Sequence, residues 1–231
     1  AVEGRIFNDP AMAQQSKTER EAIFDSMNEV LARLHQVDVA AVGLGDYGRT
    51  GQYVARQIAR WSKQYAELKT ERIEAMEKLT AWLPAHIPAE DPTSIVHGDY
   101  RLGNIIIHPT EPRVVAVLDW ELSTLGHPLC DLAYNCLGYH LPDPPHGYAN
   151  VDFRATGIPT EAEYVDAYRQ RTGRQRIDNW NFYLAFSLYR LAAIAQGVYR
   201  RGLSGNAANA ESIKMSNAAR ERAELAWSLV G

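Results

Sequence analysis

Apolar residues recur at helical spacing over most of the chain and change to a strand-like pattern only near its middle. The first apolar stripe follows a capping-box pattern at Thr18–Glu21 and predicts an amphipathic helix that ends near His35. Two more stripes predict helices over about 54–65 and 73–83. Residues 1–15 are too few to form a sheet of their own. The first stripe consists of Ile23, Met27, Val30 and Leu34.

Three short apolar runs in the middle of the chain predict β-strands. Beyond them helical spacing returns, and the stretch from Ile177 is apolar nearly all round, which predicts a buried central helix. We therefore expect one α+β, mainly helical domain over 1–231, with helical regions at 16–84 and 129–229 around a strand region at 94–120. The predicted strands are 94–96, 105–107 and 114–118; the later helices are about 129–137, 160–172, 177–200 and 206–229, with a loop at 141–159.

The strand region contains HGDYRLGN and, further on, LDW. These segments place Asn104 five residues after Asp99, and Asp119 fifteen residues after Asn104. Phosphoryl transfer needs a carboxylate to orient the attacking hydroxyl and accept its proton, and oxygen ligands to hold Mg²⁺. Protein kinases use the same Asp-to-Asn spacing. We predict Asp99 as the general base and Asn104 with Asp119 as the magnesium ligands.

Two departures from the protein-kinase pattern point to a different family. Gly98 replaces the Arg of HRD, and DWE replaces DFG. Together with GHPLCDLA further on, these motifs resemble the aminoglycoside phosphotransferase and choline kinase superfamily, over about 2–199. Within that superfamily, the motifs most resemble those of kinase-like domains found alone in bacteria or fused to acyl-CoA dehydrogenases.

This resemblance implies the C-terminal lobe of a protein-kinase-like fold, with a small β insert carrying the catalytic loop. It also implies transfer from ATP, with Mg²⁺, to a hydroxyl of a small molecule. In such proteins the residue matching His97 holds the catalytic loop through hydrogen bonds, and the one matching Asp131 anchors it from a helix N-terminus. Both residues are therefore expected to support the site without reacting.

No nucleotide-clamping lobe is expected before Asp99, because the early lysines fall in or beside predicted helices. The glycine pattern GLGDYG at 43–48 follows a predicted helix, which favours a plain interhelical loop over a nucleotide loop. Two interpretations follow. The chain is a phosphotransferase lobe with little or no activity as this fragment, or it is a pseudokinase-like scaffold without the nucleotide clamp.

The acceptor molecule is constrained only by charge. Residues 151–201 carry eight Arg against five acidic residues, a local balance of +3. This balance disfavours a polycationic aminoglycoside and favours an anionic acceptor, because Arg suits phosphate and carboxylate groups. The resemblance to dehydrogenase-fused domains suggests a hydroxyacyl-CoA or a related hydroxy acid. The alternative is that most of these Arg side chains are solvated helix faces. No substrate-binding residue is predicted.

Composition and charge argue against several other classes of protein and of binding site. With 46% hydrophobic and 23% charged residues in 231, the chain is typical of globular proteins. A net charge of −4 without a basic run argues against a nucleic-acid partner. No signal-like or membrane-spanning run occurs, so we expect a cytoplasmic protein with buried, unbridged thiols at Cys130 and Cys136. Histidines lack metal-site spacing, which argues against a zinc or iron centre.

Overall fold

The computed structural model divides the chain into two compact units, each built from two separate stretches of sequence. Unit 1 comprises residues 1–50 and 92–178, and unit 2 comprises residues 51–91 and 179–231. All five residues predicted for the site fall within unit 1. The structure describes residues 2–141, 147–148, 151–203 and 211–231, with side chains in the last range described from 217.

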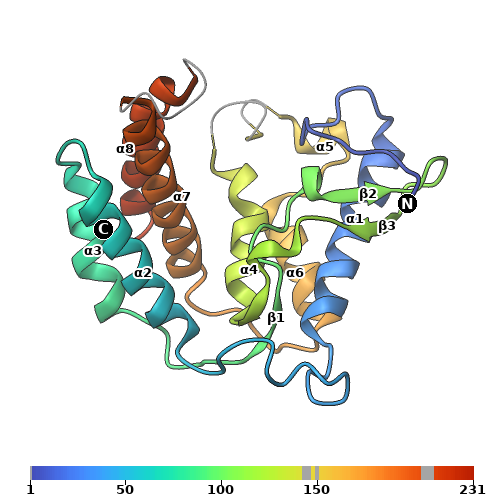
Figure 1. Cartoon of the computed structure of the whole chain (residues 1–231). Coiled ribbons are helices and arrows are strands. Elements are labelled where there is room, and N and C mark those ends of the chain that lie inside the picture. The colour runs from blue at the N-terminus through green and yellow to red at the C-terminus, as the bar shows by residue number, and fades with distance from the viewer. Residues whose placement is uncertain (1, 142–146, 149–150, 204–210) are drawn as a thin grey trace. The chain divides into compact units, whose positions relative to one another are not determined.

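Unit 1 is organised around helix α1, which packs against β1, β3, α5 and α6 (Figure 1). Its expected end at His35 is confirmed, but its start is not the predicted capping box. Ser16 is the N-cap, and its side chain accepts the backbone N–H of Glu19 at 3.2 Å. The helices of this unit are α1 (Lys17–His35), α4 (Pro128–Asn135), α5 (Phe153–Thr156) and α6 (Glu161–Arg171).

The buried stripe of α1 differs from the predicted one in its second half. Ile23 and Met27 are buried as expected, but the stripe continues through Leu31. Val30 and Leu34, which the sequence pattern favoured, are only half-buried. The buried side chains therefore recur every fourth residue, and the next position on this face is His35.

The strand region forms two separate antiparallel pairs. Strand β2 (Ile105–Ile107) pairs with β3 (Val114–Val117), which confirms the predicted hairpin. Strand β1 (Ser94–Val96) pairs instead with β4 (Thr124–Gly126), which the sequence analysis missed. A three-residue strand containing Thr and Gly is too short to show a strand pattern of its own. A short 3₁₀ turn at Leu102–Asn104 ends the catalytic loop (97–104), and another at Trp120–Leu122 follows the hairpin.

The N-terminal segment has no strand of its own, but it attaches to the hairpin. Arg5 and Ile107 exchange two backbone hydrogen bonds, of 2.7 and 2.8 Å. Gly4 permits this approach, because a Cβ there would lie 2.4 Å from the carbonyl oxygen of Ile107. The Arg5 guanidinium then donates to the carbonyls of His108 and Glu111 and pairs with Glu19 on α1.

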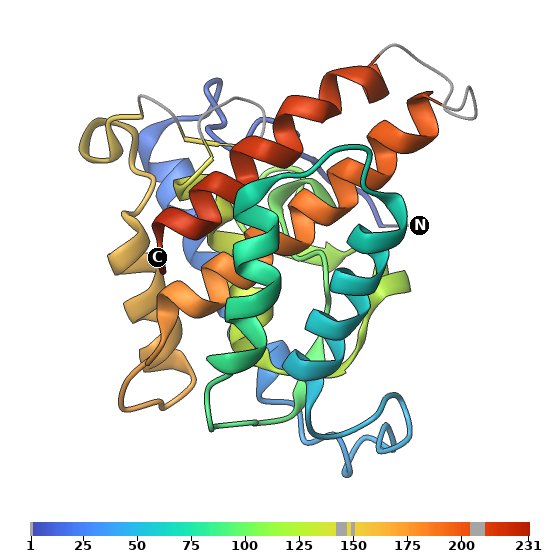
Figure 2. The ribbon, with the colours of Figure 1, turned by 90° about the vertical axis from the view of Figure 1, so that its left-hand side faces the viewer.

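Unit 2 consists of helices. The long α7 packs along α8, α2 packs against α7, and α3 packs against α8 (Figure 2). Most of α7 is buried, which confirms the predicted central helix, although it starts at Trp180. The predicted start of the last helix, at about 206, lies outside the described residues. The helices of this unit are α2 (Tyr53–Leu68), α3 (Glu74–Ala85), α7 (Trp180–Leu203) and α8 (Glu211–Ser228).

Two further expectations can be compared with the structure. Cys130 and Cys136 are both buried and unbridged, as predicted. Across the described residues, the helices are too short or too polar for any of them to cross a membrane.

Candidate phosphotransfer site

The catalytic loop leaves β1 at a tight turn that only glycine can form. Gly98 has a φ of +85°, and a Cβ at this position would lie 2.8 Å from the Leu122 carbonyl oxygen. A side chain here would be strained by its backbone and would also collide with the segment after the hairpin. This explains why a residue such as the Arg of the protein-kinase HRD motif has no place in this chain.

The structure brings Asp99 and Asn104 into direct contact. The Asn104 side-chain nitrogen donates to the Asp99 carboxylate at 2.7 Å and to the Asp99 carbonyl at 2.9 Å. Arg101 makes a weaker contact with the same carboxylate, 3.4 Å from Nε to Oδ2. The Asp99 side chain is 23% exposed, so solvent can reach it.

His97 connects the catalytic loop to the β2–β3 hairpin. Its Nδ1 accepts the backbone N–H of Asp99 at 3.2 Å, and its Nε2 lies 2.7 Å from the carbonyl oxygen of Leu118. A backbone N–H only donates and a carbonyl only accepts, so the ring proton resides on Nε2. Both ring nitrogens therefore form hydrogen bonds to the backbone. His97 thus holds the loop in place, and neither nitrogen is available as a base.

Asp119 lies directly beside these contacts. The backbone N–H of Leu118 donates to the Asn104 carbonyl at 2.7 Å, so the residue before Asp119 is tied both to Asn104 and to His97. Asp119 itself has a φ of +60°, a left-handed conformation that Asp enters more readily than most residues. Its side chain is exposed, and no described residue forms a hydrogen bond or ion pair with it.

The oxygen atoms of Asn104 and Asp119 are suitable ligands for magnesium. The Asn104 nitrogen faces Asp99, which leaves its side-chain oxygen facing away from that contact. Hard oxygen donors of this kind, one amide and one carboxylate, are what Mg²⁺ prefers. Two protein ligands are also typical of magnesium, which keeps water and phosphate oxygens in its other positions.

Asp131 clamps the start of the catalytic loop from the first turn of α4. Its carboxylate accepts the backbone N–H groups of His97 at 2.5 Å and of Gly98 at 2.8 Å. Burial acts to raise the pKa of Asp131, but the nearby His35 and the two backbone N–H groups outweigh it and hold the pKa below its ordinary value. The anchoring position implied by the family resemblance is therefore occupied by an ionised carboxylate.

Helix α1 contributes two contacts that the sequence analysis did not anticipate. The hydroxyl of the fully buried Tyr100 donates to the Met27 carbonyl at 2.8 Å. His35 lies behind the clamp, with Nε2 3.4 Å from Asp131 Oδ2. A signal for His35 existed in the sequence, because it continues the spacing of Ile23, Met27 and Leu31 along one helix face. A histidine on a buried stripe requires a polar partner.

Three of the eight arginines in residues 151–201 form ion pairs with acidic residues outside the catalytic loop. Arg171 pairs with Asp25, Arg169 with Asp166, and Arg176 with Asp178. Arg169 and Arg171 lie on α6, as the helix-surface interpretation predicts, whereas Arg176 lies in the loop between α6 and α7. These three pairs reduce the number of arginines available to an acceptor, but they do not decide the charge of that acceptor.

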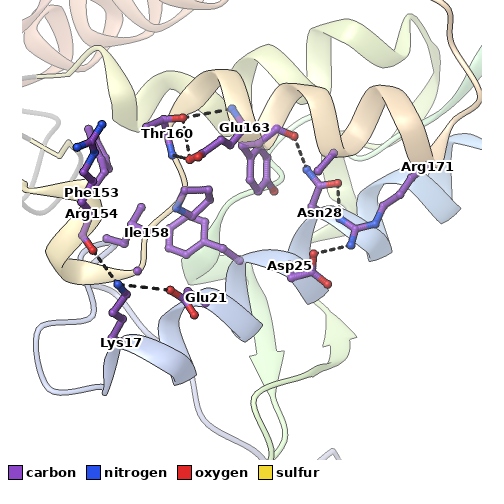
Figure 3. A pocket seen from close by; sticks show the side chains of 15 residues that line it. Lys17, Glu21, Asp25, Asn28, Phe153, Arg154, Ile158, Thr160, Glu163 and Arg171 are labelled. Carbon is purple, nitrogen blue, oxygen red and sulfur yellow. Dashed lines mark hydrogen bonds and ion pairs between the residues drawn. The ribbon is translucent and has the colours of Figure 1, made fainter.

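A cavity of about 550 Å³ lies along α1, α5 and α6, and Figure 3 shows its side chains. Four of its charged side chains form ion pairs, Lys17 with Glu21 and Arg171 with Asp25; Lys17 also donates to the Arg154 carbonyl, and Arg171 to the Asn28 side chain. Of the described residues that line it, none is a predicted site residue.

Comparison with known proteins places the chain among phosphotransferases. A family model described as the phosphotransferase enzyme family matches residues 1–180. The chain is 48% identical to mouse acyl-CoA dehydrogenase family member 10 over 97% of its length, and 42% identical to human acyl-CoA dehydrogenase family member 11 over 99%. It spans only 21% and 30% of those two relatives.

Solved structures agree with this placement. One crystal structure is that of a Ralstonia eutropha protein named as an aminoglycoside phosphotransferase. Its sequence is 52% identical to this chain, the TM-score is 0.96, and the match covers 99% of this chain and 70% of that one. Choline kinase LicA from Streptococcus pneumoniae is 15% identical with a TM-score of 0.52, covering 90% of this chain and 66% of that one. At that identity the likeness to LicA shows a shared fold.

Proposed function

This chain belongs to the phosphotransferase enzyme family, and on that premise we propose that it is the catalytic lobe of an ATP- and Mg²⁺-dependent small-molecule kinase. The observation that carries the proposal is the contact between Asp99 and Asn104 beside Asp119. A capping or turn role for Asp99 would not require an amide donor at this position. The scaffold alternative gives no chemical reason to keep all three residues.

In the proposed reaction the acceptor hydroxyl lies against the Asp99 carboxylate. The carboxylate orients the hydroxyl and takes its proton as the oxygen attacks the γ-phosphorus of ATP, while the bond to the leaving ADP oxygen breaks. Asn104 holds the carboxylate in this orientation through its amide nitrogen. Mg²⁺ bound by Asn104 and Asp119 would supply positive charge to the phosphate oxygens.

We infer that the acceptor is an anionic hydroxy compound, with hydroxyacyl-CoA as the first class to test. The support is the pair of relatives named for acyl-CoA dehydrogenases, which contain a segment similar to nearly the whole of this chain. A kinase segment in such a protein would act on a substrate carrying the same acyl-CoA group. If the acceptor belongs to this class, aminoglycosides should not be phosphorylated at a comparable rate.

The 231 residues by themselves are expected to turn over slowly or not at all. Kinases of this type hold the nucleotide phosphates with a strand-borne Lys, but each lysine that precedes Asp99 lies in or beside a described helix. The proposal is therefore tested in the natural protein at its full length. Those lysines are Lys17, Lys63, Lys69 and Lys78.

The test is a coupled assay of ADP release with ATP, Mg²⁺ and a panel of hydroxyacyl-CoA thioesters and free hydroxy acids. Asp99→Asn should lower kcat by about 10² to 10⁴-fold, because it removes the proton acceptor and keeps the shape. Nucleotide binding, measured by calorimetry, should be unchanged. Asp38→Asn is the matched control, since Asp38 only caps a turn through Ala40 and Ala41. Near-normal turnover by Asp99→Asn would refute the assignment.

A further inference from the structure

Behind the Asp131 clamp lies a buried chain of polar groups that connects three helices. The chain runs from Tyr168 on α6, through His35 at the end of α1, to Asp131 on α4. The Tyr168 hydroxyl is 2.7 Å from His35 Nδ1, and His35 Nε2 is 3.4 Å from Asp131 Oδ2. The two rings of His35 and Tyr168 also meet edge to face, with centroids 5.7 Å apart.

These contacts leave His35 little freedom. Its side chain is 1% exposed and that of Asp131 is 3% exposed. An ionised carboxylate only accepts hydrogen bonds, so His35 Nε2 carries a proton directed at Asp131. Tyr168 fixes the rotation of the ring through the other nitrogen. Both nitrogens of the His35 ring are thus held, and only Nε2 contacts the Asp131 carboxylate.

His35 is the sole side-chain donor to the clamp among the residues that the structure describes. The other two donors to Asp131 are the backbone N–H groups of His97 and Gly98, which belong to the loop being clamped. A carboxylate held only by the loop could turn with it. At 3.4 Å the histidine contact is the longest of the three, yet it alone ties the carboxylate to a separate helix.

We propose that His35 is a positioning residue of the phosphotransfer site, which fixes the Asp131 carboxylate so that this carboxylate can hold the turn before Asp99. The inference rests on the proposed function in that it assigns this site to phosphotransfer. The hydrogen-bond geometry itself does not depend on that function. Tyr168 serves as the support of the His35 ring. Neither residue contacts Asp99 in the structure, so both act through Asp131.

The test replaces His35 by two amide side chains of different length. His35→Gln places an amide nitrogen near the position of Nε2 and keeps a donor toward Asp131. His35→Asn places its amide near the position of Nδ1 and does not reach the carboxylate. Both are measured in the 231-residue chain by hydrogen exchange of the His97 and Gly98 amides, relative to the Leu118 amide, whose partner is Asn104.

With His35→Asn, the two clamped amides should exchange at least about tenfold faster relative to Leu118, since hydrogen bonds to charged groups are worth at least that factor. With His35→Gln the ratio should stay within about threefold of the unchanged chain. Because a general loss of stability would speed all three amides, it would not move the ratio. An unchanged ratio in His35→Asn, or equal changes in both variants, would overturn the proposal.

His140→Asn is the control, because His140 Nε2 contacts Glu161 at 2.9 Å in the same unit and does not touch Asp131. It should leave the ratio unchanged. If His35→Asn does not fold, Tyr168→Phe takes its place, because it removes only the hydroxyl that holds the ring. Faster exchange of the clamped amides is then expected, and unaltered exchange would contradict the role of His35.

A second measurement links the position to catalysis. In the full protein with an accepted substrate, His35→Asn should lower kcat about tenfold or more, with the acceptor KM within about threefold, and His35→Gln should recover most of kcat. If the unaltered protein transfers no phosphoryl group to any acceptor, the proposed function fails. The exchange ratio then still decides whether His35 positions the loop.

Discussion

The side-chain nitrogen of Asn104 donates a 2.7 Å hydrogen bond to the carboxylate of Asp99. Asn104 thus contacts the proposed base through its side-chain nitrogen, and its side-chain oxygen is the proposed magnesium ligand. The two proposed functions of Asn104, orienting Asp99 and binding Mg²⁺, are linked through one amide group. Any replacement of Asn104 should therefore alter both the turnover rate and the metal requirement.

Asn104→Ala should lower kcat by about 10²-fold and raise the magnesium concentration needed for half-maximal rate, because it removes both contacts. Titrating Mg²⁺ in the ADP-release assay checks this. Asn135→Ala is the comparison variant: Asn135 also donates to the catalytic loop, at the Tyr100 carbonyl, but it has no contact with Asp99. It should leave the magnesium midpoint unchanged. An Asn104→Ala enzyme with a normal magnesium midpoint would exclude Asn104 as a ligand.

The turn at Gly98 should not tolerate a side chain. Gly98→Ala is expected to cost about 2 kcal/mol or more, from the positive φ and from contact with the Leu122 carbonyl. Urea unfolding of the 231-residue chain measures this. Gly45→Ala is the matched control, because no atom lies within 4 Å of a Cβ at Gly45. Its effect should stay within about 0.5 kcal/mol, and an equal loss in both variants would contradict the argument.

The lowered pKa of Asp131 makes a contribution to stability that depends on pH. Because the pKa of Asp131 in the folded protein lies below its ordinary value of about 3.9, the contribution is present above about pH 4 and disappears as pH falls through the folded pKa. Asp131→Asn removes it. The difference in unfolding free energy between the two proteins should therefore be largest near pH 6 and shrink toward pH 2.5. A difference that stayed constant over this range would mean that Asp131 is not ionised in the fold.

Arg5 should stabilise the hairpin that leads to Asp119. Its guanidinium donates to the His108 and Glu111 carbonyls and pairs with Glu19, so Arg5→Ala should cost about 1.5 kcal/mol in urea unfolding. Arg33→Ala is the control. The Arg33 pair with Glu29 is 4.0 Å long with side chains 77% and 53% exposed, and its removal should cost less than about 0.5 kcal/mol. Equal losses would show that Arg5 is an ordinary surface charge.

Local sequence determined most of the elements and the residues of the proposed site. Helices such as α2 and α6, and the β2–β3 hairpin, carry their own periodicity, so their positions could be predicted within a few residues. Asp99, Asn104 and Asp119 could be proposed as site residues from the sequence because their spacing is set by one short loop and one hairpin. The family, too, was readable from these motifs and is confirmed by the comparisons.

Tertiary structure decided the rest, because the deciding contacts join residues far apart in sequence. Strand β4 is defined by its pairing with β1 and has no pattern of its own. The clamp requires Asp131 to meet His97 and Gly98, and His35 becomes part of it only because α1 brings its buried face to α4. Such hydrogen bonds leave no periodic trace in either partner's local sequence. Periodicity records which face of a helix is buried, but only the fold determines what that face meets.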